Sequence, residues 1–533
     1  MTDFIDAPAL KAMIRDVGES GAELALLDVR ESGQFGADHM LHAIPCPYSI
    51  LETRVMSLVP RKSVRMVLID AGDGTAQKAA RRLAGLGYTG ISILTGGNAA
   101  WTAAGFEVFQ GVNVPSKAFG EVVEHEADTP RIPAEELNAM IVRSENMVIV
   151  DGRTPEEHNR MSIPGGISVP NAEMIYRIHD LAPDPETTVV VNCAGRTRSI
   201  IGAQALINAG LPNKVVALKA GTMGWTLAGF KLENGSTLRY PDDMSDDGAV
   251  KAAEYAADVM KTFGLPTVDR DTLSAWQGDD DRTLFVLDVR AVEEFTAGHL
   301  PGSVHAPGGQ LVQATDQWCG VWGARVVLAD SAPCARAAIT GHWLKQMGWD
   351  VHILDGGLSD TEAVEQGMPS GVVAGIADLP AVAPAELSKA IDAGSVLVVD
   401  VDQSMDYRDE HLPGAVWCPR ARIDRLQVPA GVQVVFYSEH ETRAHLAAID
   451  LAEVTDTPVA VLQGGREAWK VAGLPFEASP DTPPDADCID YLFWVSRRHM
   501  GSDDAARAYL EWEENLPAQI VADGDARFTV MTR

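Results

Sequence analysis

The sequence lacks the features that mark membrane, secreted and metal-binding proteins. No stretch reaches the ~18 consecutive apolar residues of a membrane-spanning helix. The first ten residues, MTDFIDAPAL, hold no cationic segment followed by an apolar one, so a secretory signal is not expected. The 6 cysteines stand singly, without a Cys-x-x-Cys pair, which argues against a disulfide or zinc framework. We therefore expect a reduced, cytoplasmic protein with no metal or other cofactor.

Positive charge is also scarce. The chain has 43 Lys and Arg against 75 Asp and Glu, which gives a formal net charge of −32. Because such a field repels phosphate, neither nucleic acid nor an anionic membrane is an expected partner. Any anion that this protein handles must be captured in a local positive pocket.

What the sequence does contain is a fourfold repeat. Four apolar runs end in an aspartate, and their spacing of 112 to 137 residues is the size of a domain. In each copy a second apolar run leads to a marker 38 to 42 residues later, and a Gly-rich turn follows after a further 27 or 28. The markers are Asp28, Asp70 and Gly97; Asp151, Cys193 and Gly221; Asp288, Asp330 and Gly357; and Asp400, Ser438 and Gly465. Chance does not keep three markers in register four times, so the chain carries four copies of one domain.

The composition and the pattern within a copy predict an α/β fold. Hydrophobic residues make up 46% and charged residues 22% of the chain, as in soluble globular proteins. The apolar runs are short, β-branched and continuous, which is typical of strands buried on both faces of a parallel sheet. Helical patterns follow them, as at 199–211, where Gly210 and Pro212 mark the end. Each copy is expected to be a mainly parallel central sheet flanked by helices.

The turns of these copies resemble those of the rhodanese family. Asp-Val-Arg follows the first strand at 28–30 and 288–290, and Gly-His-Leu-Pro-Gly-Ser occupies 298–303. A Gly-Gly-x-x-x-Trp turn ends at Trp101 and again at Trp469. The resemblance implies four tandem rhodanese-like domains.

The resemblance covers residues 1–478 and departs from the family pattern mainly in the second copy, where Asp151-Gly152-Arg153 replaces Asp-Val-Arg. The predicted divisions are domain 1 at 1–120, domain 2 at 121–240, an acidic linker and connecting helix at 241–264, domain 3 at 265–375, domain 4 at 376–478, and a linker with a short C-terminal helical tail at 479–533. The connecting helix is placed at 249–263.

In the tail, residues 488–515 have the pattern of two short helices, with Ser502 as an N-cap between them. The aromatic residues of the tail are expected to pack on a neighbouring domain, and a binding role is the alternative. These residues are Tyr491, Phe493, Trp494, Tyr509 and Trp512.

Only the second copy keeps the nucleophile of the family. The resemblance implies sulfur transfer by a cysteine at the end of the central strand, whose persulfide is cradled by the following loop. Here Cys193 opens the sequence Cys-Ala-Gly-Arg-Thr-Arg at the register position of the second marker, directly before a predicted helix. The expected site is the catalytic Cys193 with the substrate-binding residues Ala194, Gly195, Arg196, Thr197, Arg198 and Ser199.

Domains 1, 3 and 4 carry an aspartate or a serine in place of the cysteine and are expected to lack a nucleophile. They would serve as scaffold, docking surface or a wall around the one complete site.

The residue types of this loop suit a thiolate nucleophile. A free cysteine with a pKa of ~8.5 is mostly protonated at neutral pH. Successive backbone N–H groups, the start of the helix near Ser199, and the cations Arg196 and Arg198 are expected to lower that pKa. Gly195 is expected to take a positive φ. A buried, inert cysteine is the alternative.

The implied mechanism is a double displacement. The Cys193 thiolate attacks the outer sulfur of a donor, and a thiol or cyanide acceptor then removes that sulfur from the persulfide. The loop would attract a dianion such as thiosulfate and stabilise the departing sulfite. Family members specific for 3-mercaptopyruvate resemble Cys-Gly-x-Gly-Val-Thr and lack arginine in the loop, so Arg196 and Arg198 favour thiosulfate. The oligomeric state is left open.

Several other residues have structural interpretations. Asp151 and Arg153 could support the site, but a structural ion pair or strand-end cap is favoured. Cys334 lies four residues beyond Asp330 and is expected to miss the cradle, with a redox role as the alternative. The histidines at matching turns are expected to be structural: His39, His299 and His411. The same holds for Cys46, Cys319, Cys418 and Cys488.

Two other functions remain as alternatives. One is a non-catalytic interaction scaffold, which would leave the Cys193 loop unused. The other is a phosphatase or arsenate reductase, because dual-specificity phosphatases share the rhodanese fold. Those enzymes have five residues between cysteine and arginine, whereas Arg198 follows Cys193 after four. The shorter loop should form a cradle too small for a tetrahedral phosphate.

Overall fold

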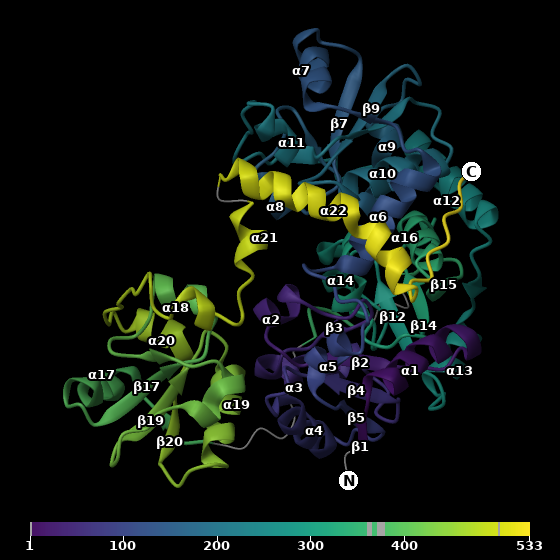
Figure 1. Cartoon of the computed structure of the whole chain (residues 1–533). Coiled ribbons are helices and arrows are strands. Elements are labelled where there is room, and N and C mark those ends of the chain that lie inside the picture. Colours follow the sequence, from purple (N-terminus) through teal and green to yellow (C-terminus); the bar gives the residue numbers. More distant parts are fainter. Residues whose placement is uncertain (1–2, 360–364, 370–378, 499–500) are drawn as a thin grey trace.

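The computed structural model describes residues 3–359, 365–369, 379–498 and 501–533, and these form four similar α/β units (Figure 1). Each unit has a five-stranded sheet whose paired strands run parallel, and the strand order of the first, β1-β5-β4-β2-β3, recurs in the other three. The predicted class and the fourfold repeat are confirmed. We call the units repeats 1 to 4.

The strands of the repeats have these bounds. Repeat 1 contains β1 (Asp3–Ile5), β2 (Ala25–Asp28), β3 (Ile44–Pro45), β4 (Met66–Ile69) and β5 (Ile91–Leu94). Repeat 2 contains β6 (Arg131–Ile132), β7 (Met147–Asp151), β8 (Ile167–Ser168), β9 (Thr188–Asn192) and β10 (Val215–Leu218). Repeat 3 contains β11 (Thr267–Val268), β12 (Leu284–Asp288), β13 (Val304–His305), β14 (Arg325–Ala329) and β15 (Asp350–Leu354). Repeat 4 contains β16 (Ala381–Val382), β17 (Val396–Asp400), β18 (Val416–Trp417), β19 (Gln433–Tyr437) and β20 (Val459–Leu462).

The α-helices of the repeats follow the same plan. Repeat 1 has α1 (Ala7–Ser20), α2 (Ser32–Ala37), α3 (Leu51–Leu58), α4 (Thr75–Gly85) and α5 (Gly97–Ala103). Repeat 2 has α7 (Ala134–Val142), α8 (Pro155–Arg160), α9 (Asn171–Leu181), α10 (Thr197–Asn208) and α11 (Gly221–Leu227). Repeat 3 has α13 (Arg270–Gln277), α14 (Val292–Ala297), α15 (Gly308–Gln313) and α16 (Ala335–Gln346). Repeat 4 has α17 (Pro384–Asp392), α18 (Ser404–Asp409), α19 (Glu441–Ala452) and α20 (Gly465–Val471).

Strand register places the first two sequence markers of each repeat side by side, at the carboxyl ends of adjacent parallel strands. In repeat 2, Asp151 at the end of β7 pairs with Asn192 at the end of β9. In repeat 1, Asp28 pairs in the same way with Ile69. The second marker is therefore the first residue beyond the carboxyl end of the central strand, where parallel α/β sheets bind their ligands.

The third marker is glycine because the chain turns back against the loop that follows the central strand. Gly97, Gly221, Gly357 and Gly465 all have φ between 53° and 67°, in the left-handed region. A Cβ at any of them would collide with backbone atoms of that loop, as with the carbonyl of Cys193 in repeat 2. Glycine supplies both the conformation and the close approach.

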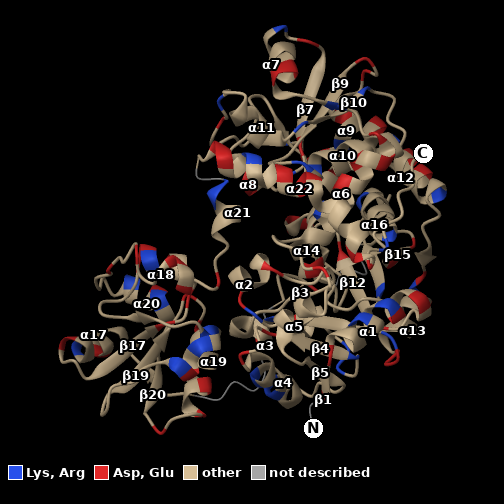
Figure 2. Cartoon of the chain, viewed as in Figure 1, with Lys and Arg blue, Asp and Glu red and all other residues tan. Residues whose placement is uncertain are grey.

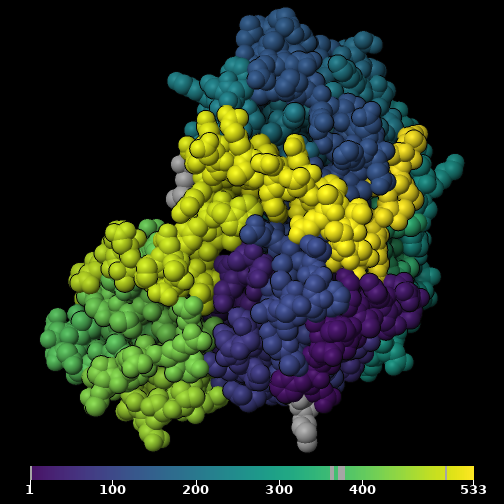
Figure 3. Space-filling model, viewed as in Figure 1, coloured from purple at the N-terminus to yellow at the C-terminus, as the bar shows by residue number. Residues whose placement is uncertain are grey.

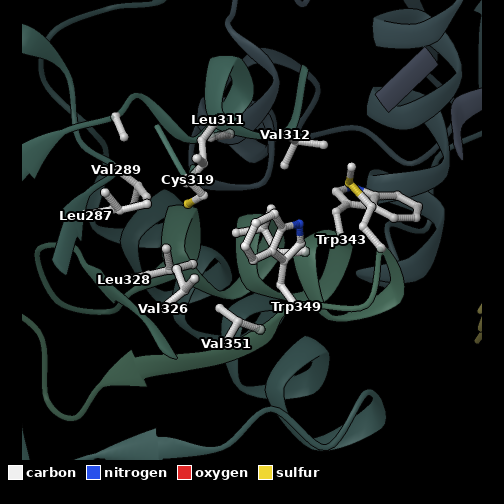
Figure 4. Packing of buried hydrophobic residues seen from close by; sticks show 14 of the residues in the cluster. Leu287, Val289, Leu311, Val312, Cys319, Val326, Leu328, Trp343, Trp349 and Val351 are labelled. Atoms are coloured by element: carbon white, nitrogen blue, oxygen red, sulfur yellow. The ribbon is translucent and has the colours of Figure 1, made fainter. Parts of the chain in front are cut away.

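Repeats 1, 2 and 3 share one hydrophobic core cluster, whereas repeat 4 has separate clusters of its own. Figure 4 shows part of the shared cluster in repeat 3, where Cys319 lies among Leu287, Val289 and Leu311. Repeat 4 lies to one side in Figure 1. Its fully buried Arg420 forms an ion pair with Glu52 of repeat 1.

Helices outside the repeats link them. α6 (Val114–Ala127) joins repeats 1 and 2, and α12 (Asp246–Thr262) joins repeats 2 and 3. α12 begins three residues before the predicted 249 because the Ser245 hydroxyl accepts the Gly248 N–H and caps its first turn. The predicted boundary between domains 3 and 4, at 375/376, lies outside the described residues.

The C-terminal tail differs from its prediction in length. α21 (Phe493–Arg497) is short, but α22 (Asp503–Asp523) has 21 residues and contains Pro517. The N-cap at Ser502 is confirmed, because its hydroxyl accepts the Ala505 N–H at 3.2 Å. α22 packs on α6, and its yellow atoms in Figure 3 lie across repeats 1 and 2. Packing against α6 keeps the helix intact past a proline that would end an isolated one.

Candidate active site

Cys193 lies just beyond the carboxyl end of the central strand of the repeat 2 sheet. It directly follows β9, whose central valines are buried, and the short loop after it ends where α10 begins at Thr197. The helix starts two residues before the predicted Ser199. The Cys193 side chain is 2% exposed, and its Sγ lies 3.3 Å from the Ser199 hydroxyl oxygen.

The surroundings of Cys193 raise the pKa of its thiol, contrary to the sequence expectation. Removal from water is the largest effect and favours the neutral thiol. Arg198, the Ser199 hydroxyl and the backbone N–H groups of Ser199 and Gly195 oppose it. The expected stabilising groups are thus present, but burial outweighs them. The sequence pattern did not reveal how deeply other segments would bury this loop.

Arg196 and Arg198 carry carboxylate partners from elsewhere in the fold. Arg196 binds Glu121 of α6 through two hydrogen bonds of 2.6 and 2.7 Å, and it also pairs with Glu124 and Glu514. Arg198 forms a bidentate pair with Glu157 of α8, at 2.6 and 2.8 Å.

Neither arginine is therefore the free cation that the loop sequence suggested. Figure 2 shows the acidic residues that α22 brings to this region.

Gly195 does not take the expected positive φ. Its lack of a side chain serves a close approach instead. A Cβ at this position would lie 2.8 Å from Cε of Met223 and 3.4 Å from Oε2 of Glu513. The latter residue comes from α22, so the sequence of the loop could not reveal the contact.

The remaining loop residues complete the wall around Cys193. The carbonyl of Ala194 accepts the Met223 N–H at 3.1 Å, which fixes the loop against α11. Thr197 is buried, and its hydroxyl has no hydrogen-bond partner among the described residues. The Ser199 hydroxyl lies 2.9 Å from the carbonyl of Arg196 and donates to it.

Asp151 and Arg153 form a buried ion pair beneath the loop. The Arg153 guanidinium donates to both carboxylate oxygens of Asp151, and His158 lies 3.3 Å from one of them. Burial alone would raise the pKa of Asp151, but the hydrogen bonds from Arg153 and His158 outweigh it and lower the pKa to about 2. Repeat 1 makes the same pair with Asp28 and Arg30 although it has no cysteine there. This recurrence supports a structural role.

Cys193 and its loop line a cavity of about 330 Å³ whose other walls lie far away in the sequence. α6 and the segment before it contribute Val112, Asn113 and Lys117; repeat 3 contributes Gln310, Gln313 and Ala314; the tail contributes Arg498, Tyr509 and Glu513. No local motif marks these residues. Of these residues, only Tyr509 belongs to a group that the sequence had singled out, the aromatic residues of the tail.

Two of those tail aromatics pack on neighbouring segments as expected. Trp512 lies against Gly111, and Tyr509 packs with Met223 of repeat 2. Tyr509 also lines the cavity and donates a hydrogen bond of 2.9 Å to Glu513. One of the aromatics therefore belongs to the site itself.

Comparison with known proteins identifies the family of this chain. A model of the rhodanese-like domain matches residues 6–104, 133–228, 269–363 and 383–472. The chain belongs to the rhodanese family. Each match spans the central strand and the following loop of one repeat.

A crystal structure of a thiosulfate sulfurtransferase from Pseudomonas aeruginosa is similar to the whole chain. It is 42% identical, has a TM-score of 0.92, and the similarity covers 99% of this chain and 100% of that one. An uncharacterized protein of Synechocystis sp. (strain ATCC 27184 / PCC 6803 / Kazusa) is 30% identical over 104 residues. Those residues are 19% of this chain and 58% of that protein.

The other three rhodanese-like repeats fill the loop with a carboxylate. In repeat 1, Asp70 accepts the N–H groups of Gly72, Gly74 and Ala76 at 2.8 to 3.2 Å. In repeat 3, Asp330 accepts the Ala337 N–H at 3.0 Å and pairs with Arg336. In repeat 4, Ser438 donates to Asp402, which also accepts the Glu439 N–H at 2.8 Å.

The remaining cysteines are buried, and burial raises the pKa of each of their thiols. Burial raises the pKa of Cys334 to about 12, and that of Cys46 and of Cys418 to the same level. The three turn histidines hydrogen-bond through Nδ1 to backbone carbonyls: His39 to Phe35, His299 to Phe295 and His411 to Leu412.

The described residues lack two further features. They contain no cluster of three His, Cys, Asp or Glu that could hold a metal ion. None of their helices is long and apolar enough to cross a membrane.

Proposed function

We propose that this protein is a sulfurtransferase that carries a sulfane sulfur on Cys193, with thiosulfate as the donor and a thiol as the acceptor. The observation that carries the proposal is the match between the Cys193 loop and the Asp70 loop. Both begin one residue beyond the central strand and lead into the following helix. In repeat 1, the Asp70 carboxylate accepts N–H groups of its own loop. In repeat 2, the thiol of Cys193 takes the place of that carboxylate.

The Asp70 loop supports anion binding at that position. A carboxylate oxygen lies two bonds from Cβ, as does the outer sulfur of a cysteine persulfide, whose S–S bond is ~2.05 Å long. The residues of repeat 2 that correspond to the three donors to Asp70 are Gly195, Thr197 and Ser199. The N–H groups of Gly195 and Ser199 already act on the Cys193 sulfur. The cradle therefore suits a negatively charged outer sulfur.

The proposed reaction has two balanced steps. The Cys193 thiolate attacks the outer sulfur of thiosulfate, an S–S bond forms to the enzyme, and sulfite leaves with the electron pair of the broken bond. The thiolate of the acceptor then attacks the outer sulfur of the persulfide and departs as the acceptor persulfide, which regenerates the Cys193 thiolate. Cyanide can replace the thiol and leaves as thiocyanate. The net charge is conserved in each step.

Thiosulfate as the donor is supported by the whole-length similarity to the thiosulfate sulfurtransferase of Pseudomonas aeruginosa, at 42% identity. The cavity of about 330 Å³ has room for a small donor and a thiol beside it. The cavity wall also holds the cationic residues Lys117 and Arg498, together with the acidic residues Glu157 and Glu513. A dianion would find cationic groups there in a chain whose net charge is −32.

Steady-state cyanolysis with thiosulfate, 3-mercaptopyruvate and glutathione persulfide side by side tests this proposal. We expect thiocyanate release to be fastest, by kcat/KM, with thiosulfate. Turnover with 3-mercaptopyruvate alone would contradict the donor, and no thiocyanate from any donor would indicate an interaction scaffold. Hydrolysis of p-nitrophenyl phosphate or reduction of arsenate without sulfur transfer would point to the phosphatase-like alternative.

A further inference from the structure

Lys117 is a buried lysine that lines the Cys193 cavity. It comes from the first turn of α6, outside the four rhodanese-like repeats, and the residue is 4% exposed. Its Nζ lies 4.9 Å from the ring centroid of Trp512 and 5.1 Å from that of Tyr509. Among the described residues, the Lys117 ammonium group makes no ion pair and no hydrogen bond, while the backbone N–H of this residue donates to the Asn113 carbonyl.

Aromatic rings and carboxylates hold a cation in different ways. An aromatic face orients an ammonium group but brings no opposite net charge. A carboxylate brings a full negative charge, and this is how Arg196 and Arg198 are held, by Glu121 and Glu157. The charged form of Lys117 therefore has no carboxylate bound to it and can interact with an anion in the cavity, whereas the charge of each loop arginine is already matched.

The carboxylate that acts most strongly on Lys117 is Glu513, without making an ion pair with it. One oxygen of Glu513 accepts the Tyr509 hydroxyl, and the other has no hydrogen-bond partner among the described residues. Burial lowers the pKa of Lys117 to about 7, with Arg498 and Arg198 acting in the same direction and Glu513 and Asp316 against it. An anion in the cavity would favour the charged form of this lysine.

We propose that Lys117 binds the sulfonate end of thiosulfate while Cys193 attacks its outer sulfur. The inference rests on the sulfurtransferase function proposed above and adds the residue that selects a dianionic donor. The sulfonate becomes sulfite when the S–S bond breaks, so the charge that Lys117 contacts persists through the step. Its helix and the tail aromatics that orient it lie outside the loop that defines the family motif.

The test compares two donors that differ by one charge. Methanethiosulfonate has a methyl group in place of one anionic oxygen of thiosulfate, and it releases methanesulfinate in the same displacement. Lys117→Met should lower kcat/KM for thiosulfate roughly 30-fold and that for methanethiosulfonate about fivefold, since halving the donor charge halves the lost interaction energy. Lys117→Arg should recover at least about a third of the thiosulfate activity, because it restores the cation.

Lys11 offers a matched control at the other end of α22. It is also a buried lysine near aromatic rings, those of Trp101 and Phe106, and it pairs with Asp523. Lys11→Met should loosen the same helix without touching the cavity, so the ratio of the two kcat/KM values should stay as in the wild type.

The outcomes separate the two proposals. Equal losses with both donors in Lys117→Met, or an equal change of the ratio in Lys11→Met, would overturn the role of Lys117 and leave the sulfurtransferase function standing. No turnover by the wild type with either donor would overturn the function and the role together. If Lys117→Met does not fold, Lys117→Gln is measured in its place. Sulfite protection of Cys193 from iodoacetamide, weaker in the folded variant than in the wild type, then decides the role.

Discussion

In repeats 1 and 2, the loop after the central strand begins with Asp70 and Cys193, respectively. Ala76 and Ser199, each six residues further on in the following helix, occupy corresponding positions. The two loops nevertheless present different side chains, a carboxylate and a thiol. Asp70 places a carboxylate on the N–H groups of Gly72, Gly74 and Ala76. Cys193 places a thiol there, beside the Ser199 hydroxyl. Under the proposed function, the anion site belongs to the shared fold, and its use for chemistry depends on whether the chain fills it with a carboxylate or leaves it to a transferred sulfur.

The comparison extends to the groups around each loop. Repeat 2 adds Arg198 from within the loop, and it adds cavity walls from α6, repeat 3 and the tail. The Asp70 loop receives its negative charge from its own first residue. A repeat without a nucleophile can thus keep the fold by satisfying its loop donors internally.

The largest expected effect is that of removing the proposed nucleophile. Cys193→Ser should lower kcat for thiocyanate formation by at least about 10³-fold, because a hydroxyl is a far weaker sulfur nucleophile than a thiolate. The circular dichroism spectrum should be unchanged. Cys334→Ser serves as the control and should retain the wild-type rate, since burial keeps that thiol protonated. Full activity in Cys193→Ser would place the chemistry elsewhere.

The next prediction concerns the role of Arg198. Arg198 is the strongest group that lowers the pKa of Cys193 against burial. Arg198→Ala should therefore move the midpoint of Cys193 alkylation to higher pH and lower kcat/KM at neutral pH by about tenfold, to a similar extent with thiosulfate and methanethiosulfonate. A loss confined to thiosulfate would instead assign donor binding to Arg198, as the loop sequence alone suggested.

A third prediction exchanges the contents of the two loops. Cys193→Asp should be inactive but more stable than Cys193→Ser by about 1–2 kcal/mol, because its carboxylate can accept the N–H groups that hold Asp70 in repeat 1. Asp70→Ala should cost about 1–3 kcal/mol, since three N–H donors, of which that of Ala76 is buried, lose their acceptor. Denaturant unfolding measures both. A Cys193→Asp variant less stable than Cys193→Ser would mean that the two loops are not equivalent anion sites.

The smallest expected effect is a failure to gain activity. Ser438→Cys in a Cys193→Ser background should give no thiosulfate turnover above that background. The new thiol would lie beside Asp402, whose carboxylate contacts Ser438 and would raise the pKa of the thiol. Glu439 and Glu441 also replace the neutral and cationic residues of the active loop. Turnover by the single cysteine would show that the scaffold, not the loop, activates the nucleophile.

The repeat and the position of Cys193 were predictable because they depend on local patterns. Apolar runs define buried strands, and a marker in register four times fixes which residue follows the central strand. The closing glycines such as Gly221 were visible in the same way, although their close approach to the loop was not.

The charges around the site were not predictable, because they depend on segments far apart in the sequence. Glu121 and Glu157 neutralise the two loop arginines, and they lie 75 and 41 positions from Arg196 and Arg198. Glu513 lies against Gly195 from the far end of the chain. For the same reason the loop sequence suggested a lowered pKa for Cys193, whereas burial by these segments raises it.

Mass spectrometry of the protein after brief treatment with thiosulfate, without acceptor, tests the central claim most directly. The account predicts one added sulfur atom on the peptide that contains Cys193, removed by cyanide and absent from Cys193→Ser. An added sulfur on the peptide of Cys334 or Cys418, or turnover with no sulfur on Cys193, would contradict it.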